Sequence, residues 1–145
     1  MSKNPTSELS HFFVAGINYK KTDTGIRGSF AIAPDQYNNL LNQAAEYGVH
    51  DLFVLSTCNR SEIYGIAESP EQLINLFCSH TQGSPELFHD LAYQKNGLQA
   101  VQHLFNVGAG LDSQILGDYE IVGQLRQAMK FAKERGFIII LLKGC

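Results

Sequence analysis

The sequence lacks the features that mark membrane, secreted or fibrous proteins. Its 145 residues include no tryptophan, only four prolines and only three cysteines. The longest uninterrupted apolar run, residues 137–142, is far shorter than the roughly 20 residues that cross a bilayer. The N-terminal residues do not have the basic and then apolar order of a signal peptide. We therefore expect a soluble, cytoplasmic protein without a membrane segment.

The cysteines are odd in number and widely spaced, at Cys58, Cys78 and Cys145. No Cys-x-x-Cys or His-x-x-x-His pair accompanies them, so the spacing predicts neither a disulfide framework nor a metal site. Free thiols are typical of a reducing compartment. Hydrophobic residues make up 44% of the chain and charged residues 17%, which is enough for one buried core.

The formal net charge is -3, but the charge is unevenly distributed along the chain. Residues 61–125 contain one basic and eight acidic residues, whereas residues 126–145 contain five basic and one acidic residue. The negative net charge argues against a protein that binds nucleic acid over most of its surface. The basic residues near the C-terminus could still form a phosphate-facing patch. A basic helix face of this kind is more often simply solvated.

The hydrophobic pattern predicts an α+β fold. Short apolar or alternating runs predict strands at residues 11–18, 51–56, 62–67 and 91–94. Apolar residues at helical spacing predict helices at residues 34–48, 69–80, 97–107 and 119–135. The intervening Gly- and Ser-containing segments predict a loop at residues 19–29, a loop with room for one helical turn at residues 81–90, and a flexible stretch at residues 108–117. The order β-α-β-β-α-β is typical of the ferredoxin-like split βαβ fold, here followed by C-terminal helices.

We expect three parts in the chain. Residues 1–10 form a polar tail. Residues 11–117 form the domain that contains most of the candidate site residues, and residues 118–145 form a C-terminal helix that leads away from this domain. In the first helix, Leu41 and Ala44 are expected to be among the apolar residues that face the core.

The segment Ser56–Arg60 carries the chemistry. It follows a predicted buried strand, and α/β sheets often place their sites at such strand ends. The cation of Arg60 would favour the thiolate of Cys58, and a guanidinium can also hold a carboxylate bidentately. A nucleophile beside an anion anchor suits attack on the carbonyl of a carboxylate-bearing substrate. The alternative is that Cys58 only packs, as most free cysteines do, and Cys78 on an apolar helix face is expected to pack.

Two weaker candidates lie further along the chain. His103 borders the apolar stripe of a predicted helix, where a lone histidine is more often a structural residue than a base. The stretch Gly108–Ser113 resembles half of a dinucleotide fingerprint, but no strand precedes it and Ser113 takes the place of the third glycine. We therefore predict no nicotinamide site there.

Several motifs together resemble the glutamyl-tRNA reductase family. The resemblance covers residues 11–135 and rests on Gly16-Ile-Asn18 with Lys20, on the segment LSTCNRSEIY at 55–64, on HLFNVGAGLDS at 103–113, and on Leu116-Gly117 and Gly123-Gln124. The family has a histidine where this chain has Tyr19. It commonly has Glu-Pro-Gln where this chain has Asp118, Tyr119 and Glu120.

The resemblance implies chemistry through a thioester. The family's cysteine thiolate, here Cys58, attacks the ester that joins glutamate to tRNA, and hydride from NADPH then reduces the thioester to glutamate-1-semialdehyde, a step in porphyrin (tetrapyrrole) biosynthesis. The motif match gives His103 a supporting role near the thiol. It assigns substrate binding to Thr57, Asn59, Arg60, Ser113, Asp118, Tyr119, Glu120 and Gln124.

The resemblance also implies partners. The family is homodimeric and continues into an NADPH-binding domain and a dimerisation domain, which we do not find in these 145 residues. We expect the chain by itself to be monomeric or weakly associating, to bind no metal or membrane, and to acylate and hydrolyse without reducing. The alternatives are a stand-alone cysteine esterase or acyltransferase, and a non-catalytic tRNA-binding module.

Overall fold

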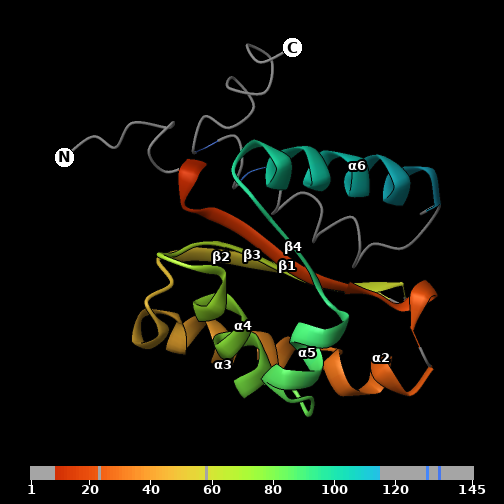
Figure 1. The fold of residues 1–145 in the computed structure, drawn as a ribbon, viewed down its shortest axis with the longest axis horizontal. Coiled ribbons are helices and arrows are strands. Elements are labelled where there is room, and N and C mark those ends of the chain that lie inside the picture. The colour runs from red at the N-terminus through yellow and green to blue at the C-terminus, as the bar shows by residue number, and fades with distance from the viewer. Residues whose placement is uncertain (1–8, 23, 58, 115–129, 131–133, 135–145) are drawn as a thin grey trace. The chain divides into compact units, whose positions relative to one another are not determined.

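The computed structural model describes residues 9–22, 24–57 and 59–114, together with residues 130 and 134 (Figure 1). The chain divides into two compact units. One comprises residues 13–95, and the other comprises residues 1–12 and 96–145. In the described part of the chain, no helix is both long and apolar enough to cross a membrane.

A four-stranded sheet forms the centre of the 13–95 unit. Its strands are β1 (Phe12–Asn18), β2 (Asp51–Ser56), β3 (Arg60–Ile66) and β4 (Tyr93–Asn96). They lie in the order β2-β3-β1-β4, and β2 pairs with β3 in antiparallel register from Ser56 opposite Ser61 to Asp51 opposite Ile66. The antiparallel β2–β3 pair and the helices that accompany the sheet confirm the predicted α+β class.

Helices cover one face of this sheet (Figure 1). They are η1 (Tyr19–Lys21), α2 (Thr24–Phe30), α3 (Pro34–Gln43), η2 (Ala44–Tyr47), α4 (Pro70–Ser79) and α5 (Pro85–Leu91). The core on this face is apolar because alternate residues of the strands, among them Ile17, Val54 and Ile63, are buried with helix side chains. The ring of Phe88 lies 5.4 Å from Phe30 and 5.6 Å from Phe77, measured between centroids.

Two predicted loops contain helices instead. Residues 24–30 form α2 despite Gly25 and Gly28, which are poor helix formers. The fully buried ring of Phe30 anchors this segment in the core, so tertiary packing outweighs local propensity. Residues 85–91 form α5, whose first turn is capped by Ser84 Oγ accepting from the Leu87 amide at 3.2 Å.

The predicted helix over residues 34–48 is present, but its buried side differs from the prediction. Leu40 is fully buried, whereas Leu41 is 41% exposed. The buried side follows Tyr37, Leu40 and Ala44, at spacings of three and four residues. The helix tightens into η2 and ends at Gly48, whose φ of 76° is readily available to glycine.

The second unit contains α6 (Leu98–Gln114). Val101 and Leu104 are fully buried, as predicted, but the helix continues through Gly108 where a flexible stretch was expected. Gly108 is itself buried, although glycine inside a helix costs about 1 kcal/mol relative to alanine. The predicted helix over residues 119–135 lies outside the described residues except for Lys130 and Glu134, which pair at 3.9 Å.

Candidate active site

The turn between β2 and β3 brings together Thr57, Asn59 and Arg60. The amide of Thr57 donates to the Arg60 carbonyl at 2.8 Å, and the Thr57 hydroxyl accepts from the Asn59 amide at 3.1 Å. A short side chain that bonds the backbone two residues ahead favours a tight turn over continued strand. The apolar run of β2 therefore ends in a polar hairpin turn at one end of the sheet. Cys58 itself lies outside the described residues.

Tyr19 supports this hairpin from η1 at two points. Its amide donates to the Asn59 carbonyl at 2.8 Å, and its hydroxyl donates to Ser61 Oγ at 2.6 Å. Ser61 Oγ in turn lies 3.2 Å from Ser56 Oγ, which accepts a hydrogen bond from the Ile32 amide at 3.4 Å. Burial raises the pKa of Tyr19, so its hydroxyl remains a donor at neutral pH.

A buried carboxylate lies next to the hairpin. Glu62 has no exposed surface, and it accepts hydrogen bonds from the hydroxyls of Tyr64, at 2.8 Å, and Tyr93. Its Oε2 is 3.6 Å from Arg60 Nη1. Burying a carboxylate is costly unless it is paired and hydrogen-bonded, and Glu62 has both kinds of partner. Burial, followed by the charge of Glu62, raises the pKa of both tyrosines, which keeps them protonated as donors.

The position of Glu62 depends on a glycine in the neighbouring strand. A Cβ on Gly16 would lie 2.6 Å from Glu62 Cγ and 3.0 Å from the Tyr93 hydroxyl. No real side chain fits at that distance, so Gly16 reserves the space for the carboxylate. On the other side, the ring of Tyr64 stacks on Phe53 with centroids 4.6 Å apart. The side chain of Glu62, which contacts Arg60, is thus held in place by residues of β1, β3 and β4.

Arg60 connects the hairpin to this buried group. Its side chain is 21% exposed, and it forms a side-chain hydrogen bond with Tyr93 as well as the contact to Glu62. A guanidinium has five N–H donors, so these contacts leave it capacity for a further anion. The arrangement can present a fixed, partly exposed cation two positions after Cys58 in the sequence.

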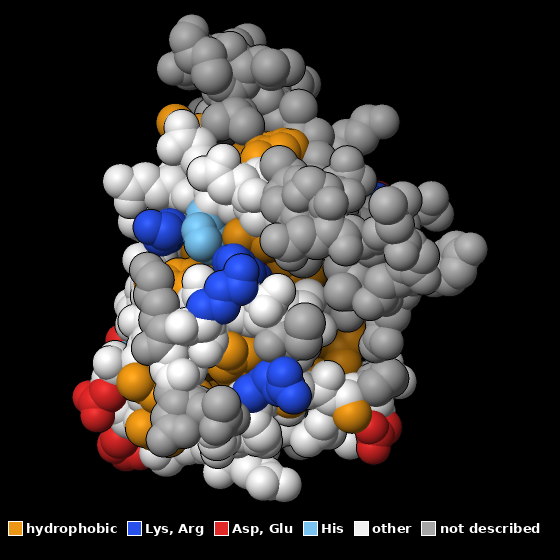
Figure 2. Space-filling view, turned by 90° about the vertical axis from the view of Figure 1, so that its right-hand side faces the viewer, with side chains coloured by type: hydrophobic (Ala, Val, Ile, Leu, Met, Phe, Trp, Pro, Cys, Tyr) orange, Lys and Arg blue, Asp and Glu red, His pale blue; other side chains and the backbone are white. Residues whose placement is uncertain are grey.

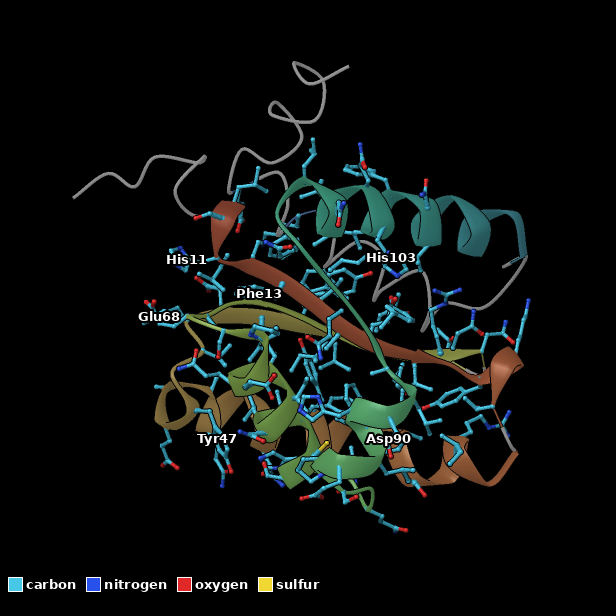
Figure 3. All side chains as sticks on the ribbon, in the orientation of Figure 1. His11, Phe13, Tyr47, Glu68, Asp90 and His103 are labelled. Carbon is cyan, nitrogen blue, oxygen red and sulfur yellow. The ribbon has the colours of Figure 1, made fainter. Side chains whose placement is uncertain are left out.

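The structure locates the other predicted site residues less completely. His103 is half-buried on α6, in the second unit, and Figure 3 labels it there. Ser113 falls within the last turn of α6. The remaining predicted site residues lie outside the described part of the chain: Cys58, Asp118, Tyr119, Glu120 and Gln124.

Three residues around the hairpin and its buried carboxylate were not predicted from the sequence. No role was predicted for Tyr19, Glu62 or Tyr93. A charged residue inside a run of buried strand residues was the available signal for Glu62, because such a group needs partners. Tyr93 had no local signal, since its partner is 31 residues away in the sequence.

Cys78 has the surroundings of a structural cysteine. It lies on α4 with 6% of its surface exposed, and burial raises the pKa of its thiol to about 12. A thiol that stays protonated at neutral pH is a poor nucleophile. In the described residues, no group of three or more His, Cys, Asp or Glu side chains could hold a metal ion.

Comparison with known proteins identifies the family. A family model described as the N-terminal domain of glutamyl-tRNAGlu reductase matches residues 15–144. The chain belongs to the glutamyl-tRNA reductase family. The resemblance noted in the sequence is thereby confirmed, and the 57–60 hairpin lies inside the matched domain.

Similar proteins agree with this assignment. The glutamyl-tRNA reductases of Christiangramia forsetii and Flavobacterium psychrophilum are 48% and 47% identical over 137 and 133 residues. These alignments cover 94% and 92% of this chain but 33% and 32% of the relatives, so the chain spans about a third of their length. A solved structure of glutamyl-tRNA reductase from Methanopyrus kandleri matches 88% of this chain and 29% of that chain, with 23% identity and a TM-score of 0.58. At this identity, the match shows likeness of fold.

Proposed function

We propose that this chain is the substrate-binding and acyl-transfer domain of a glutamyl-tRNA reductase, with Cys58 as its nucleophile. The observation that carries the proposal is the hairpin turn that holds Thr57, Asn59 and Arg60, which flank Cys58 in the sequence, within the domain that the family model matches. Glutamyl-tRNA is the proposed substrate, and porphyrin biosynthesis in the cytoplasm is the proposed setting.

The proposed reaction is transfer of the glutamyl group from oxygen to sulfur. The Cys58 thiol loses its proton to solvent, and the thiolate attacks the carbonyl carbon of the ester. The bond from that carbon to the ribose oxygen breaks, and the released tRNA hydroxyl takes up a proton. A thioester on Cys58 remains, and water can hydrolyse it to free glutamate. Covalent catalysis of this kind divides one difficult step into two easier ones.

Arg60 has two proposed roles in this reaction. Its charge favours the thiolate at residue 58, because an adjacent cation lowers a thiol pKa. Its guanidinium also suits the side-chain carboxylate of the glutamyl group. Contacts with Glu62 and Tyr93 support these roles, since they fix the guanidinium before the substrate arrives. Roles for Thr57, Asn59, His103, Ser113 and residues 118–120 and 124 remain predictions from the family motif.

The described residues do not fit an NADPH site. The glycines at 108 and 110 lie inside α6, whereas a dinucleotide fingerprint needs a loop between a strand and a helix. We therefore derive no hydride step for this chain. Reduction by NADPH, and the homodimer of the full-length family, would require regions of the relatives that these residues do not cover.

We also propose that the fold is the ferredoxin-like split βαβ. Two observations support it: the element order β-α-β-β-α-β, and a sheet in which β1 and β3 are central while β2 and β4 form the edges. In this topology, the β2–β3 turn lies at one end of the sheet.

Single-turnover mixing with glutamyl-tRNA tests the function. We expect the chain to release free tRNA, and Cys58→Ser to abolish that release. Cys78→Ala is the matched control, because it removes a buried thiol with a raised pKa and should leave release intact once folding is verified. Release by Cys58→Ser at the parent rate would show that the assignment is wrong.

A further inference from the structure

Positive charge gathers at the end of the sheet that carries the hairpin. Lys20 lies in η1, which the hydrogen bond from the Tyr19 amide to the Asn59 carbonyl holds against the turn. Arg27 lies on α2, which contacts both η1 and β3. Both side chains are exposed. Together with Arg60 they form what we term the hairpin cation group, and Figure 2 shows Lys and Arg side chains across this side of the molecule.

Two carboxylates lie at the opposite end of the same sheet. Asp51 begins β2, where it pairs with Ile66, and Glu68 follows two residues beyond that pair. Figure 3 labels Glu68 at this end. These two carboxylates are therefore separated from the hairpin cations by the length of the strands. Cations gathered at one place raise the local concentration of an anion there, even where the net charge of the chain is negative.

Two cations of this group, Lys20 and Arg27, are available to an anion. Within the ranges that the structure describes, neither Lys20 nor Arg27 forms an ion pair with a carboxylate. Long exposed cationic side chains of this kind bind phosphate, lysine as a point charge and arginine through its fork. If Lys20 and Arg27 served only to keep the surface solvated, they would not need to lie near the turn that carries the proposed nucleophile.

We propose that Lys20 and Arg27 bind backbone phosphates of the acceptor end of the RNA while its terminal ester lies at residue 58. This inference rests on the proposed function. The ester is joined to the last nucleotide, so phosphates of the preceding nucleotides must pass close to the hairpin. Single-stranded RNA is held by such positive tracks with strong salt dependence.

Direct binding tests the inference without requiring any chemistry. Fluorescence anisotropy would measure binding of 5′-labelled, uncharged tRNA to the parent chain and to Lys20→Ala/Arg27→Ala. At about 0.1 M salt we expect the double variant to bind roughly tenfold more weakly. The slope of log K against log salt should become shallower by about 1.4, that is about 0.7 for each lost phosphate contact. Lys95→Ala is the control, because that lysine lies on β4 and belongs to neither the hairpin cation group nor the basic C-terminal segment.

A second arm separates this inference from the proposed function. Acyl transfer would be compared for glutamyl-tRNA and for 3′-O-glutamyl-adenosine, which has the ester but no phosphate. The double variant should lose at least tenfold more rate at limiting substrate on glutamyl-tRNA than on the small ester. Equal losses on both substrates, or an unchanged salt slope in the anisotropy arm, would overturn the phosphate contacts even if Cys58 is the nucleophile. Normal phosphate contacts without any acyl transfer would instead overturn the proposed function.

Discussion

The two faces of the sheet use the same strands for different purposes. On the face covered by helices, Ile17, Val54 and Ile63 form part of a core of mainly apolar side chains. On the other face, Gly16 and Glu62 belong to a buried hydrogen-bonded group that reaches Arg60 in the hairpin. The helix-covered face therefore provides general stability, whereas the other face fixes the geometry of Arg60.

The helix-covered face should respond most strongly in stability and least in chemistry. Phe88→Ala removes a fully buried ring that contacts Phe30 and Phe77, and it should lower the free energy of unfolding by about 3–5 kcal/mol. Urea denaturation measures this change. Leu41→Ala is the control, because Leu41 is 41% exposed and should cost less than about 1 kcal/mol. Equal costs for both variants would contradict the assigned core.

The buried carboxylate should be nearly as sensitive. Glu62→Ala leaves Arg60 and two tyrosine hydroxyls without their acceptor, and it should cost about 3 kcal/mol. It should also lower the rate of tRNA release in the molecules that remain folded. Glu71→Ala removes a carboxylate that is 55% exposed and paired with His89, so a loss below about 1 kcal/mol is expected. A Glu62 variant as stable as the Glu71 variant would disprove the buried network.

Gly16 tests the spacing between the strands. Gly16→Ala introduces a Cβ at 2.6 Å from Glu62 Cγ and should cost about 1–3 kcal/mol by overpacking. Gly28→Ala is the matched control, since a Cβ there has nothing within 4 Å and lies in α2. That substitution should stabilise the protein by about 0.5–1 kcal/mol, because alanine favours helix. Thermal melts should therefore shift in opposite directions for the two variants.

The smallest expected stability effect lies in the support of the hairpin. Tyr19→Phe removes only the hydrogen bond to Ser61 and should cost about 1 kcal/mol. It should slow tRNA release severalfold without changing the half-saturating substrate concentration, because the turn is displaced but the substrate contacts remain. Tyr37→Phe loses a comparable bond to the backbone of Val54 and should leave release unchanged. Equal rates of tRNA release for both variants would show that the Tyr19 hydroxyl does not support the hairpin.

The local pattern of apolar and polar residues predicted the first three strands and the hairpin well. The apolar run before Ser56 and the polar residues after it are sufficient to end a strand in a turn, and the structure confirms β1, β2 and β3 close to their predicted bounds. The apolar spacing of the 98–107 segment was equally clear.

Contacts between distant residues account for what the sequence could not reveal. α2 has two glycines and forms because Phe30 is buried in the core, which only the folded chain determines. The contacts of Glu62 with Tyr93 and of Tyr19 with Ser61 join residues 31 and 42 positions apart. No local periodicity records such partners. The predicted roles of Cys58 and of residues 118–120 remain predictions.

The most direct test is the intact mass of the chain after brief exposure to glutamyl-tRNA. The account predicts a single glutamyl adduct that peptide mapping assigns to Cys58 and that hydroxylamine removes, as expected of a thioester. Cys78, whose thiol has a pKa raised to about 12, should carry none. An adduct on another residue, or released tRNA with no adduct on Cys58 at any reaction time, would contradict the central claim.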